Sequence, residues 1–208
     1  MHPRCTHASS RLIVATSSDH AATLRPQIKA IFDPLAVLRT LDKHGVMYII
    51  VGALGRVIHG SDELTAGVDI VPAMAAKNLR QLRLALGDLN ARSPDGNVPD
   101  LEKELRRQPV LELRTDAGEV KIVAEPPGTR GYRTLRTRAT REPLGKDVCP
   151  SVASLDDHAI MLAVLDRDRD VEPLRTVRRL IELDHERHGR RPTQLAAQPR
   201  PAVTVRPV

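Results

Sequence analysis

The sequence contains very few aromatic residues: no tryptophan, two tyrosines and one phenylalanine among 208 residues. The hydrophobic core must therefore be built from leucine, valine, isoleucine and alanine. The shortage also leaves almost no rings on which nucleic-acid bases could stack. This counts against a single-strand binder of the aromatic type.

Cysteines and long apolar runs are scarce as well. The two cysteines, Cys5 and Cys149, lie far apart and form neither a metal-binding spacing nor a disulfide framework, so we expect a reducing, cytoplasmic setting. No stretch approaches ~18 consecutive apolar residues, so neither a transmembrane helix nor a membrane partner is expected. The apolar run at residues 12–15 is too short for a secretion signal.

The remaining composition is that of a globular protein with a basic surface. Hydrophobic residues make up 41% of the chain and charged residues 28%, and the length favours one domain. The formal net charge of +6 leaves two interpretations open. One is an anionic partner, and the other is a solvated, arginine-rich surface.

The pattern along the chain predicts a domain at residues 31–188 between two loosely ordered ends. Residues 1–30 show no sustained period, apart from a short strand expected at Leu12 to Ala15, and residues 189–208 form a basic, proline-rich tail expected to be disordered. Asp33-Pro34 predicts the start of a helix that ends at His44-Gly45.

The later elements are predicted from hydrophobic period and turn residues. We expect helices at 73–89, 154–165 and 171–188, one or two helical turns at 101–107, a hairpin of strands 110–115 and 119–123, and a second hairpin of strands 138–142 and 146–149.

The most informative stretch runs from Val46 to Pro72. Its apolar, β-branched start predicts a buried strand at Val46 to Val51, which Gly52 ends. A short helix is expected at residues 53–59, and a second strand at residues 68–71 carries Asp69. Strand, glycine, helix and an acidic strand together are typical of folds that place a phosphate beside a metal ion.

This stretch resembles the DNA polymerase β-like nucleotidyltransferase superfamily, in particular the small bacterial AbiEii and MenT toxins. Gly52-Ala53 stands at the family's glycine pair, and Gly67-Val68-Asp69 stands at its Asp-x-Asp. The resemblance implies an α/β fold, with a small mixed β-sheet and helices packed against it. It also implies transfer of a nucleotide, with Mg²⁺ as the cofactor if the protein is active and no cofactor otherwise.

The resemblance further implies three metal-binding carboxylates, of which this chain keeps one. Asp69 matches the second acid, Gly67 replaces the first, and Lys121 replaces the third. A Lys121–Asp69 ion pair is expected in place of the metal. Glu119 is the nearest substitute ligand, and Asp62 and Glu63 are the others. Some relatives carry a basic residue for the triphosphate where this chain has Leu162, which we expect to pack in a helix.

Two anion-binding sets are open to alternative interpretations. Gly52, Ala53 and Ser61 are expected to bind a nucleotide phosphate, or else to form a tight turn needed for packing. His59, on the same helix, is expected to be a packing or surface residue. A run of arginines is expected either to follow a nucleic-acid backbone or to form a solvated face: Arg130, Arg133, Arg136, Arg138 and Arg141.

Three hypotheses for function follow. The first is a degenerate nucleotidyltransferase-type protein, a pseudoenzyme that binds an anion, nucleic acid or a partner protein. The second is an active toxin that transfers nucleotides to tRNA or another acceptor, with Asp69 helped by Glu119 or Asp62. The third is a regulatory partner of an active relative, which would pair it with a cognate toxin or antitoxin.

Overall fold

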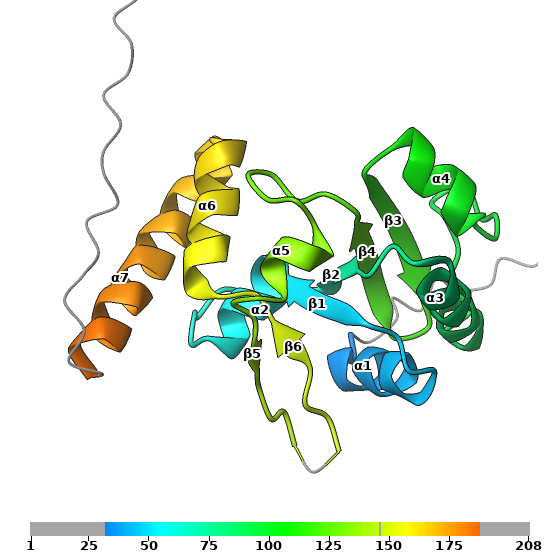
Figure 1. Ribbon diagram of the computed structural model, residues 1–208, viewed down its shortest axis with the longest axis horizontal. Helices are drawn as coiled ribbons and strands as arrows, with labels where there is room; N and C mark the ends of the chain where they lie inside the picture. The colour runs from blue at the N-terminus through cyan, green and yellow to red at the C-terminus, as the bar shows by residue number, and fades with distance from the viewer. Residues whose placement is uncertain (1–31, 146, 188–208) are drawn as a thin grey trace, which may run out of the picture.

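The computed structural model describes residues 32–145 and 147–187, and a six-stranded mixed sheet lies at its centre (Figure 1). The strand order is β3-β4-β2-β1-β6-β5. β1 pairs antiparallel with β2 and parallel with β6, and β2 pairs parallel with β4. The strands are β1 (Tyr48–Val51), β2 (Gly67–Pro72), β3 (Val110–Thr115), β4 (Gly118–Val123), β5 (Thr140–Arg141) and β6 (Ser151–Val152).

Helices cover both faces of this sheet (Figure 1). They are α1 (Pro34–Lys43), α2 (Gly52–Ile58), α3 (Ala76–Asp88), α4 (Leu101–Arg107), α5 (Tyr132–Leu135), α6 (Leu155–Leu165) and α7 (Val171–Arg187), with a 3-10 turn at Asp168–Asp170 before the last. This arrangement confirms the predicted α/β class, a small mixed sheet with helices packed against it.

The two layers of the core follow from the alternation of side chains along the strands. One face buries Ile50, Ile70 and Ile122 beneath α1 and α3. The other buries Ile49 and Val71 beneath α5 and α6. Tyr48 and Phe32 are the aromatic residues of the first layer, so aliphatic side chains supply nearly all of it, as the composition predicts.

Local capping sets the first helix as the sequence predicts. The carboxylate of Asp33 accepts a hydrogen bond from the backbone amide of Ala36 at 3.0 Å, and proline occupies the first helical position. Gly45 follows the end of α1 with φ +64°, a conformation that favours glycine. Ser154 caps α6 in the same way, by accepting from the amide of Asp157 at 3.2 Å.

The second hairpin corrects an expectation. Its strands are β5 and β6 at 140–141 and 151–152, rather than 138–142 and 146–149. A two-residue strand is too short to show an alternating pattern, and β6 is set by its parallel pairing with β1 through Ile50 and Val152. The expected strand at Leu12 to Ala15 and both loosely ordered ends lie outside the described residues. Within the described ranges, no helix is long and apolar enough to span a bilayer.

His158 is a buried titratable side chain that the sequence patterns did not single out. It lies on α6, and among the residues that the structure describes its Nε2 atom has no hydrogen-bond partner. A Cβ atom at Gly55 would lie 2.7 Å from that nitrogen, so the glycine allows α2 to pack against the imidazole. Burial, reinforced by Arg56 and His59, lowers the pKa of His158 to about 3.

His158 should therefore make the fold sensitive to acid. Between pH 6.5 and about 3 the unfolded chain binds a proton at this position and the folded chain does not. As the pH is lowered through that window, the free energy of unfolding should fall, by up to about 1.4 kcal/mol per pH unit. Urea unfolding at several pH values should show a shallower fall for His158→Gln. Equal slopes in the two proteins would contradict this account.

Candidate functional site

The neighbouring strands β2, β4 and β3 present polar side chains on one face of the sheet. The residues that alternate with them point to the opposite face and are buried in the core. In the parallel register of β2 and β4, Gly67 lies opposite Glu119 and Asp69 lies opposite Lys121. The structure thus brings the first, second and third expected acid positions together, as two non-acidic residues beside one aspartate. They line a hollow of about 210 Å³, called here the Asp69 hollow: Gly67, Asp69, Glu112, Arg114, Glu119 and Lys121 among its lining residues.

Asp69 is held against the backbone at the junction of β1 and α2. Its register partner is Val51, so the following residue, Gly52, passes directly beside the carboxylate. A Cβ atom at Gly52 would lie 2.1 Å from Asp69 Oδ2. Gly52 also has φ +68°, a conformation that side chains rarely adopt. Glycine is therefore required here by both backbone conformation and space.

The surroundings of Asp69 make its ionised form less favourable than in water. Burial raises the pKa of Asp69, while the positive charges of Lys121 and Arg56 act to lower it. Glu112 and Glu119 add smaller effects in the raising direction. Burial is the largest of these causes, so the pKa lies above its ordinary value.

Lys121 does not form the expected ion pair with Asp69. Its Nζ lies 2.8 Å from Oε1 of Glu112, directly opposite it on β3, and this contact lowers the pKa of Glu112. The antiparallel β3–β4 pairing offers Lys121 a partner near solvent, whereas the Asp69 carboxylate is half-buried beside Gly52. Lys121 therefore affects Asp69 through its charge alone.

The loop between α2 and β2 is organised around an ion pair of its own. Arg56 is buried and donates two hydrogen bonds of 2.7 Å to the carboxylate of Glu63. The hydroxyl of Ser61, also buried, donates to the same carboxylate at 3.0 Å. Glu63 and Ser61, expected as a metal ligand and a phosphate ligand, are thus bonded to protein groups. Asp62 is exposed.

Two further positions match the packing roles expected for them. Leu162 is buried and packs with Ala159 and Val177 where α6 meets α7. His59 is half-buried, and its Nε2 lies 2.8 Å from the carbonyl oxygen of Ala153, which ties α2 to the residue after β6.

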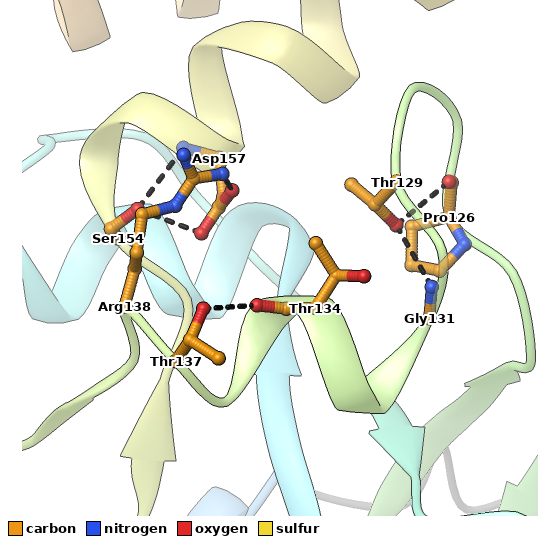
Figure 2. Close-up of polar contacts among 8 residues, drawn as sticks. All are labelled: Pro126, Thr129, Gly131, Thr134, Thr137, Arg138, Ser154 and Asp157. Atoms are coloured by element: carbon orange, nitrogen blue, oxygen red, sulfur yellow. Dashed lines mark hydrogen bonds and ion pairs between the residues drawn. The ribbon is translucent and has the colours of Figure 1, made fainter.

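The structure divides the expected arginine run into two groups. Arg138 pairs with Asp157, a fully buried carboxylate that also accepts a hydrogen bond from Ser154 (Figure 2). Arg141 is exposed on β5. The other three face a cleft of about 910 Å³ together with two arginines of α4 that the sequence patterns did not single out. We call this site the arginine cleft: Arg106, Arg107, Arg130, Arg133 and Arg136.

Comparison with known proteins gives little beyond this geometry. No protein-family model and no curated protein matches the chain. Among solved structures, the chain is similar to the lincosamide antibiotic adenylyltransferase LnuA in its lincomycin-bound crystal structure, with a TM-score of 0.49 and 15% sequence identity. The match covers 72% of this chain and 99% of that chain. A likeness of this extent assigns no activity, so the function has to be inferred from the residues themselves.

The contact between Gly52 and Asp69 can be measured by substitution. Gly52→Ala combines positive-φ strain with overlap at the carboxylate, and should lower the free energy of unfolding by about 2–4 kcal/mol. Adding Asp69→Ala to Gly52→Ala should restore part of that loss. The matched control is Gly96→Ala, where φ is +87° and no atom lies within 4 Å, so only the strain applies. Urea unfolding of the natural protein, Asp69→Ala alone and these three variants completes the comparison, and purely additive effects at positions 52 and 69 would refute the contact.

Proposed function

We propose that this protein is a nucleotidyltransferase-type protein of the AbiEii/MenT-like toxin branch that has lost nucleotidyl transfer and acts by binding. The observation that carries the proposal is the register of β2 and β4. It sets Gly67, Asp69 and Lys121 side by side, so that a single carboxylate stands where three acids are expected.

The chemistry of nucleotidyl transfer explains why this matters. Two divalent cations have to bridge the attacking oxygen, the phosphate and the leaving group, and carboxylates have to hold them. Glycine at position 67 has no ligand atom, and the amine of Lys121 repels a cation. Throughout residues 32–145 and 147–187, no three His, Cys, Asp or Glu side chains are grouped so that they could hold a metal ion. The residues therefore do not fit a Mg²⁺ pair.

One observation favours the second hypothesis, an active enzyme. Glu119 lies opposite Gly67 on the same face and lines the hollow with Asp69. It is exposed and lies opposite the first acid position, so it is placed to assist Asp69. Asp62 has no comparable position, because it is exposed in the loop before β2.

The regulatory hypothesis and the protein partners it requires stay predictions. A cognate toxin or antitoxin would have to recognise the surface of this chain, and tRNA or a nucleotide would have to bind where positive charge gathers. The cytoplasmic setting likewise stays a prediction from cysteine usage.

A transfer assay separates binding from catalysis. The full chain, incubated with Mg²⁺ or Mn²⁺, labelled nucleoside triphosphates and total tRNA, should transfer no label, because the two-cation arrangement lacks its ligands. Metal-dependent transfer that is abolished by Asp69→Ala would end the proposal and establish the active enzyme. Loss of such transfer in Glu119→Gln as well would identify Glu119 as the substitute ligand.

Restoring the missing acids tests whether the site has been placed correctly. Gly67→Asp with Lys121→Asp should create Mn²⁺ binding, measurable by titration calorimetry, that the natural chain lacks. A side chain at position 67 fits closely, since its Cβ would lie 3.1 Å from the Glu119 carbonyl oxygen and 3.2 Å from the Glu119 Cβ, and a small shift should accommodate it. Lys121→Asp alone is the matched control. A double variant that folds and ignores Mn²⁺ would show that the metal site lies elsewhere.

A further inference from the structure

The arginine cleft lies at the opposite end of β2 and β4 from the Asp69 hollow. Its lining includes Ala73 and Ala124, which directly follow the two parallel strands, and it shares no lining residue with the hollow. The four steps along the chain from Asp69 to Ala73 span about 13 Å of extended strand. The cleft is therefore a separate site, and its chemistry can be considered without the lost acids.

The cleft concentrates positive charge from two separate segments of the chain. Arg106 and Arg107 come from the end of α4, and Arg130, Arg133 and Arg136 come from α5 and its flanks. Glu125 is the acidic residue among those that line it. Bringing five guanidinium groups around one cleft costs repulsion, which an anionic ligand would relieve.

These arginines have few partners within the protein. Arg106 lies 3.8 Å from Glu102 and Arg107 lies 3.9 Å from Glu104, beyond hydrogen-bonding distance, and their side chains are 81% and 70% exposed. Among the described residues, no ion pair or side-chain hydrogen bond engages the arginines at 130, 133 and 136. All five guanidinium groups can therefore turn toward a ligand.

The segment that carries the second group of arginines is fixed in place. The Thr129 hydroxyl donates to the carbonyl oxygen of Pro126 at 3.0 Å and accepts from the amide of Gly131 at 3.3 Å (Figure 2). Gly131 has φ +69°, and a Cβ there would lie 2.7 Å from the carbonyl oxygen of Ala124. Leu135 of α5 is fully buried in the core. The turn thus holds its arginines against the end of β4.

The lining of the cleft is not polar throughout. It includes the apolar side chains of Met47, Met74, Leu105 and Pro109 and the half-buried ring of Tyr132. One of the two tyrosines of the chain is therefore at the site where positive charge gathers. A ring and an apolar wall suit the face of a nucleobase, while guanidinium groups suit phosphates.

We propose that the arginine cleft binds a short single-stranded segment of nucleic acid. Phosphates contact the arginines of α4 and α5, and a base packs against Tyr132 and the apolar wall. A duplex keeps its bases stacked inside and could use only the arginines. Because the cleft offers one aromatic ring, it suits a strand of which one or two bases pack on the wall while the neighbouring phosphates contact the arginines, rather than a long stacked run. The inference rests on the proposed function only in assigning the protein a binding role.

Fluorescence anisotropy with the full chain tests the site. The probe is a labelled single strand of about eight nucleotides, a length within the range that one binding domain covers. The buffer contains EDTA and no triphosphate. We expect Arg106→Ala and Arg133→Ala each to weaken binding several-fold and to reduce the slope of log affinity against log salt by about 1. The matched control, Arg83→Ala, removes an exposed arginine of α3 outside the cleft and should bind like the natural protein.

Tyr132→Leu separates base contact from charge, since it keeps apolar volume and removes the ring. It should weaken single-strand binding about tenfold while leaving the salt slope unchanged. Circular dichroism and urea unfolding confirm that each variant is folded. Duplex of the same sequence and ATP alone serve as competitors, and we expect both to compete poorly.

Several outcomes would overturn the proposal. One is affinity for the duplex equal to that for the single strand, and another is full competition by ATP, which would make the cleft a mononucleotide site. A third is an affinity for the single strand in Arg106→Ala and Arg133→Ala that equals that of the natural protein. Failure here is distinct from failure of the proposed function. If the protein transfers nucleotides and also binds the single strand in the cleft, only the proposed function is refuted. If it neither transfers nucleotides nor binds the single strand, only the cleft proposal is refuted.

Discussion

The close approach of the Asp69 carboxylate to the backbone of Gly52 is the constraint on which this end of the sheet depends. The antiparallel register of β1 and β2 pairs Val51 with Asp69, so the chain must turn into α2 directly beside the acid. Only a glycine with positive φ can make that turn. The same packing partly buries the carboxylate, which raises the pKa of Asp69. An acid in this place is thus part of the strand-to-helix junction.

The charges around the junction are matched mostly within the protein. Lys121 pairs with Glu112 across the β3–β4 hairpin, and Arg56 pairs with Glu63 in the loop before β2. A cation entering the Asp69 hollow would meet the field of Lys121, and a phosphate would meet the acids at 69 and 119. Neither ligand finds the excess of opposite charge that phosphoryl chemistry needs. This electrostatic balance supports binding elsewhere on the molecule rather than transfer at this site.

Features encoded by adjacent residues could be predicted from the sequence. The Asp33-Pro34 start of α1, the Ser154 cap of α6 and the hairpin turn before Gly118 all depend on short-range hydrogen bonds and backbone preferences. The central strands could be predicted because their apolar residues are β-branched and continuous. The positions of β5 and β6 could not, because two-residue strands are selected by the neighbour they pair with.

The details of the site depended on tertiary contacts in the same way. The resemblance places Lys121 on the strand beside Asp69, and the register of β2 and β4 sets the two residues opposite each other. Lys121 contacts Glu112 because β3 places that acid opposite it. No local sequence pattern relates β3 to position 69. The arginine run was visible as a run, yet Arg138 is drawn away by a buried aspartate and Arg106 and Arg107 arrive from α4. The spacing of residues along the chain does not show which of them lie close together in the fold.

The parallel pair β2–β4 separates two charged regions of the molecule, one at each end of the strands. The acids at 69 and 119 lie at or near the start of these strands, and the arginine cleft lies where the strands end. Surface charges about 10 Å or more apart are largely screened at 0.1 M salt. Replacing an acid at one end therefore changes little at the other, and the cleft keeps its positive field through changes in the hollow.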